Sequence, residues 1–119
     1  MSERIKKVNE LLRQEINQLL LRQVDFGDVF VTITQVDTSS DLKYAKIKII
    51  IYPEKETPKI FRILEKNIYD LQQGLNERLR RNIKYVPKIK FEIDEVEKQA
   101  QETERALNQI KKDKQEGWV

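Results

Sequence analysis

The stretch that decides the fold is VTITQVDTSSDLKYAKIKI, residues 31–49. Its first half alternates Val31 and Ile33 with threonines, and β-branched residues at a period of two are typical of a strand. Its second half alternates apolar residues with lysines from Ala45 onward. Between the halves, residues 37–41 are short polar side chains that favour a turn. The stretch therefore predicts a hairpin with one buried face and one wet face.

An amphipathic helix is predicted on each side of this hairpin. Before it, apolar residues recur at steps of three and four and share one helix face: Ile5, Val8, Leu12, Ile16, Leu19 and Leu20. After it, Thr57 and Pro58 suit a helix start, and an apolar stripe continues to Ile83. A single straight helix of that length would outrun so small a domain, so we expect an interruption. Gly74 is the obvious place, and one bent helix or two helices fit equally well.

A third strand and a last helix complete the predicted order. Residues 88–93 alternate again after Pro87, and residues 96–110 carry the thin apolar edge of a helix. We expect residues 1–94 to form the folded domain and residues 95–119 to add a C-terminal helix and a disordered tail. Such an order favours an α+β fold, a two-layer sandwich with the lysine-bearing face of the sheet open to solvent.

The composition argues against an enzyme. The 119 residues include no His and no Cys, so the commonest general base, thiol nucleophiles and thiolate or imidazole metal ligands are missing. Ser39, Ser40 and Asp41 could be mistaken for a catalytic cluster, but without a base their turn-forming role is favoured. No apolar run reaches the roughly 20 residues of a membrane span, and no secretory signal is visible. We expect a cytoplasmic protein without metal, cofactor or small-molecule substrate.

The positive charge is concentrated near the third strand. The chain has a net charge of +3, and the stretch from residue 78 to residue 90 contains no acid. Its six basic residues are Arg78, Arg80, Arg81, Lys84, Lys88 and Lys90. A cluster of this kind attracts a phosphate backbone, so we take these residues as candidates for RNA contact. The alternative is a solvated face with basic groups placed well at a helix C-terminus.

The hairpin offers a second group of candidates. Lys46 and Lys48, with Lys43 before them, share a sign and point off the sheet. They either contact RNA or prevent edge-to-edge pairing of sheets, as lysines on edge strands commonly do. Phe30 has the same outward parity, and either stacks on a base or is covered by a terminal segment.

Taken together, these segments resemble the ribosome-binding factor A family. Residues 31–49 look like its V-T-I-T-x-V pattern followed by S-x-D-L-x-x-A-x-V, with the same order and spacing. Residues 83–91, IKYVPKIKF, are similar to its basic L-R-x-V-P-x-L-x-F segment. Arg4 fits the start of the family's first helix, and Asp94 fits the acid that closes its last strand.

The resemblance spans about residues 3–110 and implies a type II KH-like fold, α-β-β-α-α-β, with a C-terminal helical extension. The family bends its central helix pair at an Ala-x-Gly element, which would fall at residues 69–71, where this chain reads YDL. The bend therefore belongs either there or at Gly74. Gly27, Gly74 and Gly117 form no Gly-x-x-Gly loop, so recognition through charge and shape is expected instead of the usual KH clamp.

For function, the resemblance implies a monomeric, non-catalytic factor that binds immature small (30S) ribosomal subunits and 16S rRNA. It would aid late maturation, including processing of the rRNA 5′ end. The alternative from the residues alone is a protein-interaction module whose basic face docks an acidic protein partner.

Overall fold

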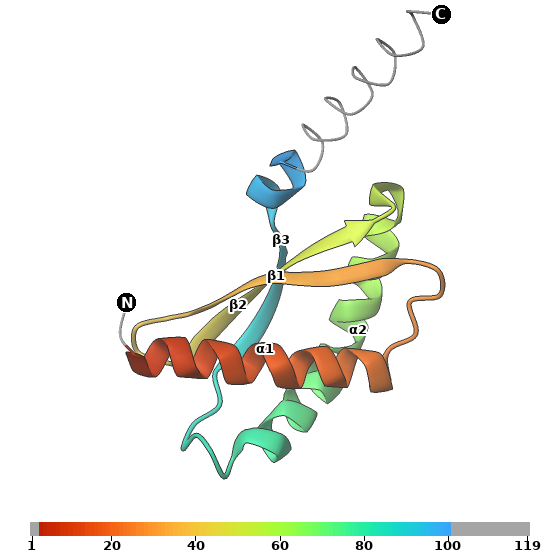
Figure 1. Cartoon of the computed structure of the whole chain (residues 1–119). Coiled ribbons are helices and arrows are strands. Elements are labelled where there is room, and N and C mark those ends of the chain that lie inside the picture. The colour runs from red at the N-terminus through yellow and green to blue at the C-terminus, as the bar shows by residue number, and fades with distance from the viewer. Residues whose placement is uncertain (1–2, 101–119) are drawn as a thin grey trace, which may run out of the picture.

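The computed structural model describes residues 3–100 (Figure 1). Along the chain the elements are α1 (Glu3–Gln23), β1 (Phe30–Thr38), β2 (Tyr44–Tyr52), a 3₁₀ turn η1 (Glu54–Glu56), α2 (Thr57–Leu79) and β3 (Lys88–Ile93). Residues 95–100 begin a further helix. The rest of the predicted last helix and the predicted tail with Trp118 lie outside the described residues. None of the helices within residues 3–100 is long and apolar enough to cross a membrane.

The sheet has three strands in the order β1-β2-β3, with β2 in the centre. β1 and β2 form the predicted antiparallel hairpin, in which Val31 pairs with Ile51. β3 lies parallel to β2, with Ile47 beside Phe91, because α2 carries the chain back across the sheet. The register of the hairpin shifts between Ile33 and Gln35, which is a bulge in β1.

Both helices cover the same face of the sheet, so the predicted two-layer α+β arrangement is confirmed. α1 packs along β1 and against α2, and α2 also packs on β2 and β3. The stripe predicted for α1 is buried from Val8 to Leu20. On the sheet, the alternate residues of β2 from Ala45 to Ile51 are buried under the helices. Each fully buried Leu or Ile contributes about 1.5–3 kcal/mol through apolar area removed from water.

The expected interruption of the second helix is absent. α2 runs as one helix through residues 69–71 and Gly74 to Leu79, so the order is α-β-β-α-β with a single central helix. A Cβ built on Gly74 would lie 3.0 Å from Leu19 Cδ2 and 3.2 Å from Gln23 Nε2. Gly74 therefore serves a close approach between α2 and α1, and of the two alternatives, one bent helix or two helices, the second is wrong.

Asp94 joins the end of the sheet to the start of the last helix. Its Oδ2 accepts a 2.6 Å hydrogen bond from the Thr34 hydroxyl, and its Oδ1 accepts a 3.1 Å bond from the Glu97 N–H. The second bond is an N-cap of the helix that begins at residue 95. The Thr34 hydroxyl and, after it, the Glu97 N–H lower the pKa of Asp94, because both stabilise the carboxylate.

Candidate nucleic-acid interface

The hairpin turn is locked by hydrogen bonds of its own residues. The Ser39 hydroxyl donates to Asp41 Oδ1 at 2.6 Å, and the same oxygen accepts the Lys43 N–H at 3.1 Å. Ser39 also pairs its backbone N–H with the Tyr44 carbonyl at 2.8 Å. Leu42 takes a left-handed backbone conformation with φ of 62°. These contacts give Ser39 and Asp41 the predicted turn-forming role, and they hold the pKa of Asp41 below its ordinary value.

The loop between α2 and β3 is anchored by apolar residues on both sides of its exposed part. The Ile83 N–H donates to the Leu79 carbonyl at 2.9 Å, and both side chains are buried. Pro87 is buried as well. Between these anchors, Lys84 and Tyr85 are exposed, with the Lys84 Nζ 5.5 Å from the centroid of the Tyr85 ring.

The two loops meet side by side. The Lys88 N–H donates to the Lys43 carbonyl at 2.9 Å, which ties the start of β3 to the hairpin turn. Between them lies an open groove of about 620 Å³ whose third wall is the start of α1. We call it the basic groove; its lining residues are Arg4, Ser40, Asp41, Leu42, Lys43, Ile83, Lys84, Tyr85 and Val86. It brings Lys43 and Lys84, which come from the two predicted clusters, to one surface.

The open face of the sheet continues from the groove along β2 and β3. Lys46 lies beside Lys90, and Lys48 lies beside Glu92, in the parallel register. Lys90 and Glu92 form an ion pair of 3.6 Å. Lys88 is exposed on the same face at the groove end. Lys43 and Lys46 are exposed and Lys48 is half-buried, so the outward position predicted for the lysines of the hairpin is confirmed, although the face also carries acids.

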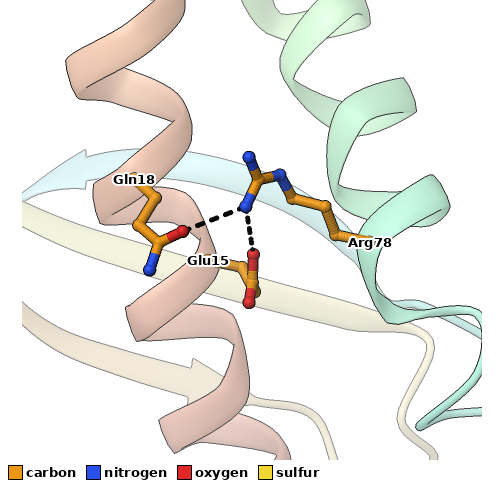
Figure 2. A network of polar contacts seen from close by, with 3 residues as sticks. All are labelled: Glu15, Gln18 and Arg78. Atoms are coloured by element: carbon orange, nitrogen blue, oxygen red, sulfur yellow. Dashed lines mark hydrogen bonds and ion pairs between the residues drawn. The ribbon is translucent and has the colours of Figure 1, made fainter.

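Arg78 is the member of the basic cluster that the structure separates from the others. Figure 2 shows its guanidinium between Glu15 and Gln18 of α1, at 2.9 Å and 3.0 Å. The Arg78 and Glu15 side chains are 27% and 24% exposed, so this ion pair is partly withdrawn from water. Arg80 and Arg81, directly after the end of α2, are exposed and do not line the basic groove.

Phe30 lies at the other end of the sheet from the basic groove. It pairs with Tyr52, whereas Tyr44, at the opposite end of β2, pairs with Lys88. The Phe30 side chain is 71% exposed, so the described part of the chain leaves it open. Base stacking by Phe30 stays a prediction.

Sequence reasoning missed three residues of this surface: Arg4, Tyr44 and Tyr85. Tyr44 and Tyr85 are exposed aromatic side chains, at 61% and 73%. The signal for Tyr44 was available, since it has the same outward parity as Lys46. Arg4 gave no local signal for a place in the groove, because α1 reaches it only through the tertiary fold.

The surface offers charge and aromatic rings. No group of three His, Cys, Asp or Glu side chains within residues 3–100 could hold a metal ion. The lowered pKa of Asp41 is explained by the Ser39 hydroxyl within the turn, and that of Asp94 by the Thr34 hydroxyl and then the helix cap. Cations with interleaved aromatic side chains are the pattern that contacts nucleic acid.

Fold and surface together define a small α+β protein that presents a basic, aromatic-bearing groove beside an open sheet. Comparison with known proteins makes the assignment specific. The ribosome-binding factor A family matches residues 4–107, so the chain belongs to that family.

Individual relatives agree with this assignment. Ribosome-binding factor A of Halothermothrix orenii is 30% identical over 95% of this chain and 93% of its own length. That of Natranaerobius thermophilus is 36% identical over 90% of this chain and 82% of its own. The fold is also similar to a homology model of ribosome-binding factor A from Thermus thermophilus, fitted into a cryo-EM map of its 30S complex. The TM-score is 0.56 at 19% identity, covering 78% of this chain and 93% of that one.

Proposed function

We propose that this protein is an assembly factor of the small ribosomal subunit, which binds immature 30S particles through 16S rRNA. It aids late maturation, including processing of the rRNA 5′ end, and then leaves. It acts in the cytoplasm as a monomer and catalyses no reaction itself. Membership of the family supports the ribosomal partner, and the relative from Thermus thermophilus is described in a 30S complex.

The basic groove is the observation that carries RNA binding. Cations from three separate segments, Arg4, Lys43 and Lys84, border it. Lys46, Lys88 and Lys90 extend the positive charge along the sheet. Side chains of this type neutralise phosphates and release counterions, which gives an affinity that falls steeply with salt.

We also propose that the domain is a type II KH-like domain that binds RNA without the usual Gly-x-x-Gly phosphate clamp. Gly74 lies inside α2, where a glycine-rich loop would be needed for that clamp. The basic groove, which lies beside the hairpin turn, takes the place of that clamp as the contact surface.

Sedimentation of a cell lysate tests the proposal. At about 50 mM salt the protein should migrate with free small subunits and bind mature ribosomes less, and the association should be lost at about 500 mM salt. Cells that lack the protein should accumulate 16S rRNA with an unprocessed 5′ end. A protein that stays at the top of the low-salt gradient would contradict the proposal, and would favour an acidic protein partner for the basic surface.

A further inference from the structure

We propose that the basic groove takes a single unpaired nucleotide, with its base stacked on Tyr85 and its phosphate held by Lys43 and Arg4. This inference rests on the proposed function and names the form of RNA that the groove receives. Proteins recognise duplex RNA mostly through phosphates and 2′-hydroxyls across the shallow minor groove of the RNA. Unpaired bases, in contrast, stack on aromatic side chains. The choice between the two depends on the shape, rigidity and charge of the groove.

The shape favours an inserted group. The volume of about 620 Å³ falls within the range of roughly 300–1,000 Å³ that is typical of sites for small ligands. Tyr85 forms part of the wall and is 73% exposed. Ile83 and Pro87, two residues away on either side, are buried and anchor the segment from which the exposed ring projects.

The hairpin wall of the groove is held by hydrogen bonds within the protein. Asp41 Oδ1 accepts from the Ser39 hydroxyl and the Lys43 N–H, and the Lys43 carbonyl accepts from the Lys88 N–H at 2.9 Å. A preformed site avoids much of the entropy that is lost when loops become ordered on binding. The backbone that carries Lys43 is thus already ordered before a ligand binds.

The charge pattern separates a nucleotide from an acidic peptide. Three cations, Arg4, Lys43 and Lys84, border the groove, together with the carboxylate of Asp41. The hydroxyl of Ser39 lowers the pKa of Asp41, so this carboxylate is ionised at neutral pH and can only accept hydrogen bonds. A peptide rich in carboxylates would meet repulsion there, whereas bases and riboses bring N–H and O–H donors.

The structural alternative is that Tyr85 serves the protein itself. Lys84 Nζ lies 5.5 Å from its ring centroid, which is within the range of a cation–π contact. At exposed sites such a contact is weak, and it leaves the other face of the ring available. A purely structural ring would not distinguish single-stranded RNA from duplex RNA.

Binding of fluorescently labelled RNA to the full chain, followed by anisotropy at about 50 mM salt, tests the proposal. The labelled probes are an unstructured ten-nucleotide RNA and a duplex of the same sequence, and unlabelled poly-glutamate of equal length is the competitor. The wild type should bind the single strand most tightly. Tyr85→Ala should weaken that binding about tenfold, because one stacked base is lost, and leave duplex binding unchanged. Tyr85→Phe should stay within about twofold of the wild type, since the ring is kept.

Tyr69→Ala is the matched control, because Tyr69 is 71% exposed on α2 and lies outside the groove lining. Its binding should equal that of the wild type. The salt dependence gives a second readout: Tyr85→Ala should keep the wild-type slope, whereas Lys43→Glu should reduce it by about one phosphate contact.

The proposal is overturned if Tyr85→Ala binds the single strand as the wild type does, if both RNAs lose affinity equally, or if poly-glutamate competes as well as RNA. These outcomes leave the proposed function intact when the wild type still sediments with small subunits. If the wild type fails to sediment with them, the ribosomal function itself is wrong.

Discussion

The contact between α1 and α2 and the basic groove both use cations from the same stretch, residues 78–90, and they differ in what faces those cations. In the helix contact, Arg78 meets Glu15 and Gln18 of α1, beside the glycine at position 74. In the groove, Lys84 meets the ring of Tyr85 and open solvent. One cation is satisfied within the protein, and the other is available to an anion.

The difference teaches that a charge cluster in sequence can divide between support and recognition. Arg78 lies on the side of α2 that faces α1, so its partner is set by helix packing. Lys84 lies after the helix has ended, where the loop turns its side chain outward. Substitutions in the helix contact should therefore change the free energy of unfolding, and substitutions in the groove should change RNA binding.

The largest effect is expected for Gly74→Val in the helix contact. A Cβ built at this position would lie 3.0 Å from Leu19 Cδ2, and the two methyl groups beyond it would overcrowd the contact with α1. Overpacking of this kind should lower the free energy of unfolding by about 2–3 kcal/mol, measured by urea denaturation. Gln73→Val, on the neighbouring exposed position, is the control and should cost well under ~1 kcal/mol. Equal stability of both variants would show that the close approach is unimportant.

Charge reversal in the groove should have the next largest effect, and on binding alone. Lys43→Glu combined with Lys84→Glu should weaken association with small subunits about 30-fold, or about 2 kcal/mol, because phosphate contacts become repulsions. The urea midpoint should not move. The control pair is Lys59→Glu with Lys66→Glu, which makes the same change of charge on exposed positions of α2. If the control pair loses as much, net charge and not the groove governs binding.

Arg78→Gln should have a smaller effect of the opposite kind, on stability and not on binding. Loss of the partly buried pair with Glu15 should lower the free energy of unfolding by about 1 kcal/mol. Subunit binding should stay at the wild-type level once folding is accounted for. A double-mutant cycle with Glu15→Gln isolates the pair, and the double variant should be little less stable than either single one. If Arg78→Gln weakened subunit binding, Arg78 would contact RNA after all.

The smallest effect is expected in the pH dependence of stability, where Asp94 differs from Asp41, the carboxylate of the groove. Hydrogen bonds lower the pKa of Asp94 in the folded state, below the unfolded value of about 3.9. Its contribution to stability is thus fully present above that pH and is lost as the pH falls through the folded pKa. The stability difference between the wild type and Asp94→Asn should shrink when urea titrations are repeated from pH 7 down to pH ~3. Asp41→Asn should change the pH dependence of the unfolding free energy less, because Asp41 is exposed. A larger change for Asp41→Asn than for Asp94→Asn would contradict the structural role given to Asp94.

Local periodicity explains why most of the fold could be predicted. The stripe from Val8 to Leu20 and the alternation from Ala45 to Ile51 each depend on residues close together in the chain. The sequence could not exclude two helices at Gly74, because a glycine inside a helical pattern marks either a break or a close contact. Only the Leu19 side chain, which is remote in sequence, decides between them.

The same reasoning applies to the site. The outward lysines Lys46 and Lys48 followed from strand parity, and their exposed side of the sheet was predictable. The pairing of Arg78 with Glu15 and the place of Arg4 in the groove depend on which segments meet in space. Sequence alone could name the cations, but it could not divide them between the two regions.

The hydrogen bond from the Lys88 N–H to the Lys43 carbonyl also determines when the basic groove can form during synthesis of the protein. The walls of the groove come from α1, the hairpin turn and residues 83–86, and β3 must align parallel to β2 before they meet. Chains are made and begin to fold from the N-terminus. A nascent chain that has delivered α1 and the hairpin therefore displays lysines without a finished groove, and competence to bind arrives only when nearly the whole domain has left the translating ribosome.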